Sequence, residues 1–135
     1  MTANTPTDRA SFNSALSAIH AEHTTLRHLA AAAATRSSHS TDDAMSLADA
    51  MAAHERTEAG LFALPFVTQP PKSVTATGAQ ARQRCLDYTS GKVLSKDPNA
   101  AAAHFIGALL AHLDAEEAWL AHEKEYQHER LSIAA

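Results

Sequence analysis

The sequence predicts an all-α protein, a single domain over residues 1–135 built as an up-down-up-down four-helix bundle. Hydrophobic residues make up 45% of the chain but aromatic residues only 5%, and alanine accounts for much of the remaining hydrophobic content. With 4 glycines, 5 prolines and few β-branched runs, the composition favours helix over strand. Helix breakers also divide the chain into four segments, most of which repeat apolar residues at helical spacing.

The first helix is expected from about Asp8 to Thr35, after a flexible stretch at residues 1–7 and before the polar sequence SSHST. Its apolar residues alternate spacings of 4 and 3, which places them on one helix face. This face comprises Phe12, Leu16, Ile19, His23, Leu26 and Ala30. His23 therefore takes a core position, whereas His20 and His28 lie off the face.

The second helix is expected to begin after Ser40 or Thr41, because Asp42 and Asp43 then lie in the first turn, where acids interact favourably with the helix dipole. It should end before Pro65, because proline lacks a backbone donor and disfavours helix in the residue before it. The same spacing predicts a buried face of Leu47, Met51, His54, Glu58, Leu61 and Pro65.

A long connection is expected at residues 65–77, followed by a third helix from about Gly78 to Leu94. The fourth helix should open at Asp97 and Pro98, an N-cap followed by a proline, and continue to about Leu131. Its predicted buried face comprises Phe105, Leu109, His112, Glu116, Trp119 and Glu123.

Two histidine–glutamate pairs, His54–Glu58 and His112–Glu116, share one spacing of 4 residues and both lie in a predicted core face. This spacing puts both side chains on one side of a helix, one turn apart. One such pair can be an exposed contact, but a buried carboxylate needs hydrogen bonds, a proton or a cation. Two buried pairs therefore indicate either a metal site or a buried hydrogen-bonded network.

The predicted helices also bring these residues to one level. His23, His54 and His112 lie roughly 18 to 23 Å from the expected starts of their helices, near the middle of each, so they can meet in one layer. Imidazole and carboxylate groups together suit iron, manganese or zinc, and the core of a helical bundle is a known setting for such a site.

Three stretches resemble the hemerythrin-like (HHE cation-binding) domain family, over roughly residues 12–126. AEHTTLRHLAAA is similar to its first-helix histidine signature, HERTEAGLFALP to its second-helix pattern, and HLDAEEAWL to its last-helix pattern. The resemblance implies a bundle that usually holds a carboxylate-bridged di-iron centre. Carried over by position, it implies the metal ligands His23, His54, Glu58, His112 and Glu116, with both glutamates bridging.

The expected third helix departs from the family pattern, because GAQARQRCLDYTSGKVL lacks the histidines that the family normally brings there. The layer facing Glu58 is expected near Ala81 to Tyr88, so Cys85 and Tyr88 are the donors available, although an inert buried thiol is the commoner state of such a cysteine. A single metal ion, a second ion with weak or unusual ligation, and a bundle without metal all remain open.

The resemblance implies an iron protein that binds or senses dioxygen, nitric oxide or peroxide, and we expect binding in preference to enzymatic turnover. The alternatives are an iron-dependent oxidase or peroxidase, and a metal-free interaction module. A formal charge of −4 gives no basic surface for nucleic acid or an anionic membrane. The single cysteine and the absence of a signal-like or membrane-spanning apolar run favour a cytoplasmic protein, monomeric or homodimeric.

Overall fold

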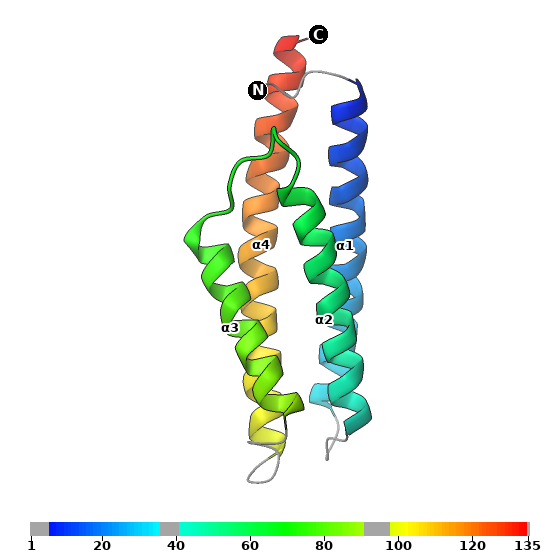
Figure 1. Ribbon diagram of the computed structural model, residues 1–135, viewed down its shortest axis with the longest axis vertical. Coiled ribbons are helices and arrows are strands. Elements are labelled where there is room, and N and C mark those ends of the chain that lie inside the picture. Colours follow the sequence, from blue (N-terminus) through cyan, green and yellow to red (C-terminus); the bar gives the residue numbers. More distant parts are fainter. Residues whose placement is uncertain (1–5, 36–40, 91–97, 135) are drawn as a thin grey trace.

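The computed structural model describes residues 6–35, 41–90 and 98–134, and of 41–44, 98–99 and 131–134 it describes only the backbone. These residues form four helices: α1 (Pro6–Ala34), α2 (Thr41–Phe62), α3 (Lys72–Thr89) and α4 (Pro98–Ala134). The helices run alternately down and up the long axis of the molecule (Figure 1), and the described ranges contain no strand. The predicted all-α, up-down-up-down bundle is confirmed.

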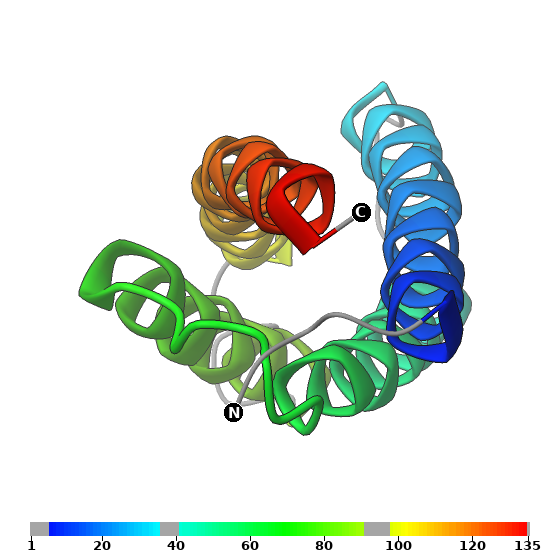
Figure 2. The same cartoon turned by 90° about the horizontal axis from the view of Figure 1, so that it is seen from above.

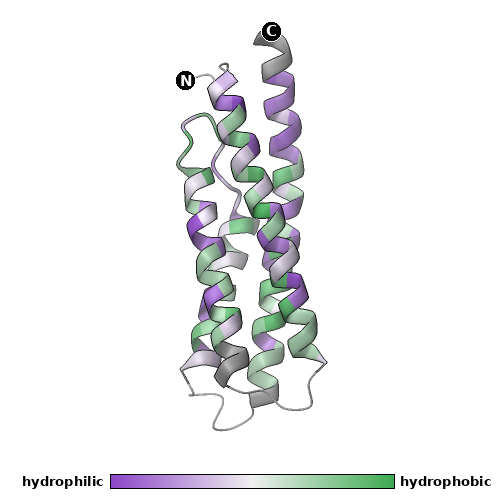
Figure 3. Cartoon of the chain, turned by 90° about the vertical axis from the view of Figure 1, so that its right-hand side faces the viewer, coloured by the Kyte–Doolittle hydropathy of each residue, from purple (hydrophilic) through white to green (hydrophobic). Residues whose placement is uncertain are grey.

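Seen along its axis, the bundle places α1 beside α2 and α3 beside α4 (Figure 2), and these two pairs make the most extensive helix contacts. Helix α4 extends past α2 and α3 (Figure 1), and its turns over residues 121–130 are largely hydrophilic (Figure 3). Among the described residues, no helix combines the length and the apolar composition needed to cross a membrane.

The apolar core has two parts, one toward each end of the bundle. One contains Leu26, Met51 and Leu109, and the other contains Ile19, Leu61 and Leu120. On α1 the boundary between them falls around His23, and on α2 it falls between Met51 and Leu61. A layer of buried polar side chains therefore separates two apolar clusters, which shield it from solvent along the bundle axis.

Most helix boundaries lie close to those expected. Helix α1 begins at Pro6, so only residues 1–5 of the expected flexible stretch fall outside the described chain. Helix α2 ends at Phe62 and α4 begins at Pro98, as predicted. Pro65 was wrongly placed on the buried face, because it follows the end of α2 and is exposed.

The third helix was predicted wrongly. It spans Lys72–Thr89 instead of Gly78 to Leu94, so the connection covers 63–71 and is shorter than expected. Pro71 takes the N-cap position in an extended conformation, with φ −71° and ψ 167°. The helix then continues through SVTATG, where packing against α4 outweighs the low helix propensity of threonine and glycine. Residues 91–97, which include part of the predicted helix, lie outside the described chain.

The connection is held to α4 by a buried carboxylate. Glu123 is 3% exposed and accepts hydrogen bonds from the backbone N–H of Thr68 at 3.0 Å and from the Thr68 hydroxyl. The Gln127 amide donates to Glu123 at 2.9 Å and to the Phe66 carbonyl at 3.1 Å. These contacts fix residues 66–68 against α4, only a few residues before α3 begins.

Candidate metal centre

The five residues that the resemblance implies as metal ligands converge in the layer between the two apolar clusters. They are buried, with exposed fractions of 2% for His23, 0% for His54, 8% for Glu58, 2% for His112 and 0% for Glu116. One ligand atom from each of His54, Glu58, His112 and Glu116 lies within 4.8 Å of all the others. The structure thus places a compact histidine–glutamate group where the sequence predicted one.

The Nε2 atoms of the three histidines all face Glu116, and those of His54 and His112 also face Glu58. Glu116 Oε1 lies 2.8 Å from His23 Nε2 and 3.0 Å from His54 Nε2, and Glu116 Oε2 lies 3.4 Å from His112 Nε2. Glu58 Oε2 lies 3.1 Å from His112 Nε2 and 3.7 Å from His54 Nε2. Helices α1, α2 and α4 therefore aim imidazole nitrogens and carboxylate oxygens at one small region.

On its outer side, each imidazole has a separate partner for Nδ1. These contacts are His23 to Glu117 at 3.2 Å, His54 to Glu22 at 3.1 Å and His112 to Thr77 at 3.2 Å. Metal-binding histidines commonly hold their second ring nitrogen in this way, because the outer hydrogen bond fixes both the tautomer and the ring orientation.

The contact with Thr77 favours the tautomer of His112 with its proton on Nδ1; in the other tautomer Nε2–H would donate to Glu58. The Thr77 hydroxyl donates to the Ser73 carbonyl at 2.6 Å, so its oxygen accepts the hydrogen of His112 Nδ1–H. In a neutral imidazole, Nε2 then carries a lone pair. That lone pair faces Glu58 Oε2 at 3.1 Å, and two acceptors at this distance repel unless a proton or a cation lies between them.

His54 shows the same arrangement. Glu22 accepts a hydrogen bond from the Thr57 hydroxyl and one from His54 Nδ1–H. Within the described part of the chain, His54 Nε2 and Glu116 Oε2 are buried without hydrogen-bond partners, because their approaches to other groups are not aligned for hydrogen bonds. Unsatisfied buried polar atoms are rare in folded proteins, and a bound cation would satisfy both.

Burial and neighbouring charges set the protonation of the centre. Burial lowers the pKa of His112 from 6.5 to about 4, aided by the positive charges of His54 and His23. Burial alone would raise the pKa of Glu116, but the hydrogen bond from His23 and the close contact with His54 outweigh it and lower that pKa. At neutral pH His112 is therefore a neutral imidazole and Glu116 an ionised carboxylate, the forms in which these groups bind metals. For His54, burial is outweighed by Glu116 and Glu22, which raise its pKa, so a metal would have to displace a proton there.

The predicted donors on the third helix, Cys85 and Tyr88, do not join this group. Because α3 begins earlier than expected, Thr77 and Gly78 lie beside His112 instead. Tyr88 is buried against Phe105 in one apolar cluster, with ring centroids 6.0 Å apart.

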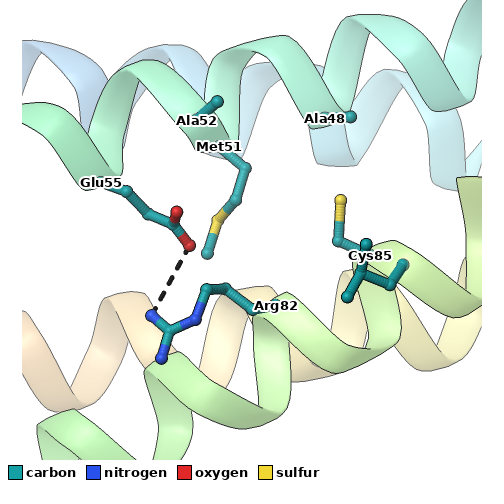
Figure 4. Close-up of a pocket in the computed structure, with 7 residues that line it drawn as sticks. Ala48, Met51, Ala52, Glu55, Arg82 and Cys85 are labelled. Atoms are coloured by element: carbon teal, nitrogen blue, oxygen red, sulfur yellow. Dashed lines mark ion pairs between the residues drawn. The ribbon is translucent and has the colours of Figure 1, made fainter.

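Cys85 lines a shallow pocket between α2 and α3, near Met51 and the ion pair of Glu55 with Arg82 (Figure 4). Burial, together with the charge of Glu55, raises the pKa of the Cys85 thiol. A raised pKa keeps the thiol protonated, which disfavours its activation as a nucleophile, and Cys85 does not belong to the compact group of possible metal ligands.

The outer partners Glu22, Thr57 and Thr77 were not predicted from the sequence, and Glu117, next to Glu116, was expected on the solvated face unless a π-bulge turned it toward the metal. Glu117 instead bonds His23 on one side and the Arg27 guanidinium at 3.0 Å on the other. The available signal was that Glu22 and Glu117 each directly adjoin a core histidine or glutamate in sequence. His20, His28, His104, His122 and His128 are exposed, and His39 lies outside the described residues.

In comparisons with protein-family models, with curated proteins and with solved structures, nothing matches this chain. The fold and the site nevertheless define a class: an all-α four-helix bundle with a buried histidine–glutamate group that could hold a metal ion.

Proposed function

We propose that this protein is a hemerythrin-like metal-binding bundle that holds iron in its core and binds a small ligand such as dioxygen, nitric oxide or peroxide. The observation that carries the proposal is the convergence of imidazole Nε2 atoms and carboxylates around two buried atoms without partners, His54 Nε2 and Glu116 Oε2. Apolar clusters on both sides and fixed outer hydrogen bonds make this arrangement costly to maintain without a cation.

The donor set is compatible with iron but does not by itself select iron over other metals. Mixed nitrogen and oxygen donors without thiolate suit iron, manganese and zinc. The resemblance of the three sequence stretches to hemerythrin-like domains adds support for iron. Bound iron would supply reversible redox chemistry and an affinity for small diatomic ligands.

The chain's own residues would orient the donors and exclude water. Glu22, Thr77 and Glu117 hold the outer nitrogens of the histidines, and the Arg27 guanidinium balances the charge of Glu117. Because none of the five core polar residues is more than 8% exposed, the layer suits a small ligand better than a bulky substrate. This supports binding or sensing over turnover of a large substrate.

The first test is the metal content of the purified protein, measured by elemental analysis with absorption spectra recorded in air and after reduction. The double variant His54→Ala/Glu58→Ala should lose the metal while keeping its helicity. A matched control, His104→Ala/Glu125→Ala, removes the same residue types at exposed positions of α4 and should keep the metal. Equal metal content in the two variants would contradict the proposed site.

A metal-free role is the second candidate, because part of the network is hydrogen-bonded within the protein itself. His23 Nε2 contacts Glu116 at 2.8 Å, and His112 Nε2 contacts Glu58 at 3.1 Å. Such a network can specify one arrangement of a bundle that serves as an interaction module. It would be favoured if reconstitution with iron, manganese or zinc leaves no bound metal and the melting temperature unchanged, since a ligand bound only to the folded state stabilises it.

A further inference from the structure

We propose that the centre takes one metal ion, bound by His54, Glu58, His112 and Glu116, and that His23 is a hydrogen-bonding neighbour of Glu116 and not a ligand. This inference rests on the proposed metal-binding function and specifies how many ions the site holds. It narrows the ligand set implied by the family resemblance, which includes His23 and two bridging glutamates.

The four proposed ligands have the spacing that a single ion requires. Their ligand atoms all lie within 4.8 Å of one another. The closest nitrogen–oxygen pairs of this group are 3.0 Å for His54 and Glu116 and 3.1 Å for His112 and Glu58. Donors about 2.0 to 2.2 Å from a shared ion are separated by roughly 3 to 4.4 Å, so one ion can contact all four with small adjustments.

His23 differs from the other two histidines in its contact with the group. Its Nε2 lies 2.8 Å from Glu116 Oε1 in an aligned hydrogen bond, whereas His54 Nε2, at 3.0 Å from the same oxygen, forms no hydrogen bond. His23 is also not part of the compact four-residue group. Its nitrogen is therefore committed to Glu116, while His54 Nε2 has no hydrogen-bond partner among the described residues and is available to a metal.

A second ion would lack donors on the side of α3. Thr77 already donates to Ser73 and accepts from His112. Gly78 brings no donor and packs against the imidazole of His112: a Cβ atom there would lie 3.1 Å from His112 Cε1. With Cys85 and Tyr88 away from the centre, the described residues would offer a second ion the imidazole of His23, whose nitrogens already contact Glu116 and Glu117, and the second oxygens of the same two glutamates.

The decisive experiment is the stoichiometry of the wild-type chain. The protein is treated with a chelator, titrated anaerobically with ferrous iron and, separately, with zinc, desalted and analysed for metal and protein. We expect about one ion per chain with either metal. Two ions per chain would overturn this inference and leave the proposed metal-binding function standing, whereas no bound ion would overturn both.

Two matched variants test the separate role of His23. His23→Gln keeps an amide that can donate to Glu116, so this variant should still bind one ion. Its metal affinity, measured by competition with a chelator, should be about 10- to 100-fold weaker than that of the wild type. His112→Gln should bind none at the same concentrations. Circular dichroism and metal-free melting temperatures establish that both variants fold. If His23→Gln loses metal as completely as His112→Gln, His23 is a ligand and the assignment fails.

Discussion

The Thr77 hydroxyl holds the imidazole of His112 from α3, 3.2 Å from Nδ1, so that Nε2 points toward the carboxylates of α2 and α4. The helix that brings no histidine to the centre thus orients one that α4 supplies. Gly78, the next residue, packs directly against the same ring. In this bundle α3 supports the proposed site through orientation and packing.

Replacing Thr77 by valine should weaken metal binding. The change keeps the side-chain shape but removes the acceptor for His112 Nδ1–H, and loss of such outer contacts typically reduces metal affinity about 10- to 100-fold. The metal-free protein should also lose about 1 kcal/mol, because His112 Nδ1–H then has only the Val74 carbonyl, among the described residues, as an acceptor. Thr77→Ser retains the hydroxyl and should keep most of the affinity. Chelator competition and urea unfolding measure the two effects, and equal affinity of both variants would contradict the role of the hydroxyl.

Two glycine-to-alanine changes should have opposite effects. At Gly78 the added methyl group meets His112 Cε1 at 3.1 Å, and Thr77 and Glu58 restrain that ring, so metal affinity should fall. At Gly60 a Cβ atom meets nothing within 4 Å, so alanine should stabilise α2 by about 0.5–1 kcal/mol without affecting the metal. Metal titration and thermal melting of both variants test this contrast. Unchanged affinity in Gly78→Ala would show that the ring can move freely.

The metal-free protein should be most stable near pH 6.5. Folding lowers the pKa of His112 from 6.5 to about 4, so between these values the unfolded chain binds more protons and stability rises with pH, by about 3 kcal/mol in total. Burial opposes protonation of His54, but Glu116 and Glu22 outweigh it and raise its pKa, so this contribution is present below pH 6.5 and is lost as pH rises through the raised value.

Urea unfolding of the chelator-treated protein from pH 4 to 8 measures this profile. Like His112 and unlike His54, Glu116 makes stability rise with pH. Because its pKa is lowered, its stabilisation is present above about pH 4.5 and is lost as pH falls further. His112→Gln should flatten the slope between pH 4 and 6.5 and leave the loss above pH 6.5. A wild-type profile that declines steadily from pH 4 upward would contradict the assignment to His112.

Glu123 should be among the most important residues for the connection before α3. Glu123→Ala leaves the buried Gln127 amide and the exposed Thr68 without their shared acceptor and should reduce the free energy of unfolding by about 1–3 kcal/mol. Amide exchange should accelerate around Thr68. Glu125→Ala removes an exposed carboxylate two residues away and should change stability by no more than about 0.5 kcal/mol. Similar stability of the two variants would show that Glu123 does not hold the connection.

Helical periodicity alone was enough to predict the fold and the buried position of His23, His54, Glu58, His112 and Glu116. Each of these residues is in phase with apolar neighbours on its own helix, so its burial can be inferred from one segment at a time. The structure confirms that all five are buried and lie in one layer. Their role as metal ligands stays a prediction, and the structure separates His23 from the compact group of four.

The outer partners Glu22, Thr77 and Glu117 could not be predicted in the same way, because their contacts join different helices and depend on helix rotation and level. The level of α3 depends on where the connection at 63–71 ends, and in SVTATG tertiary packing against α4 overrides weak helix propensity. Local pattern therefore determines which side chains enter the core. Only the packing of the helices decides which atoms meet there, and it places Thr77 and Gly78, not Cys85 and Tyr88, beside His112.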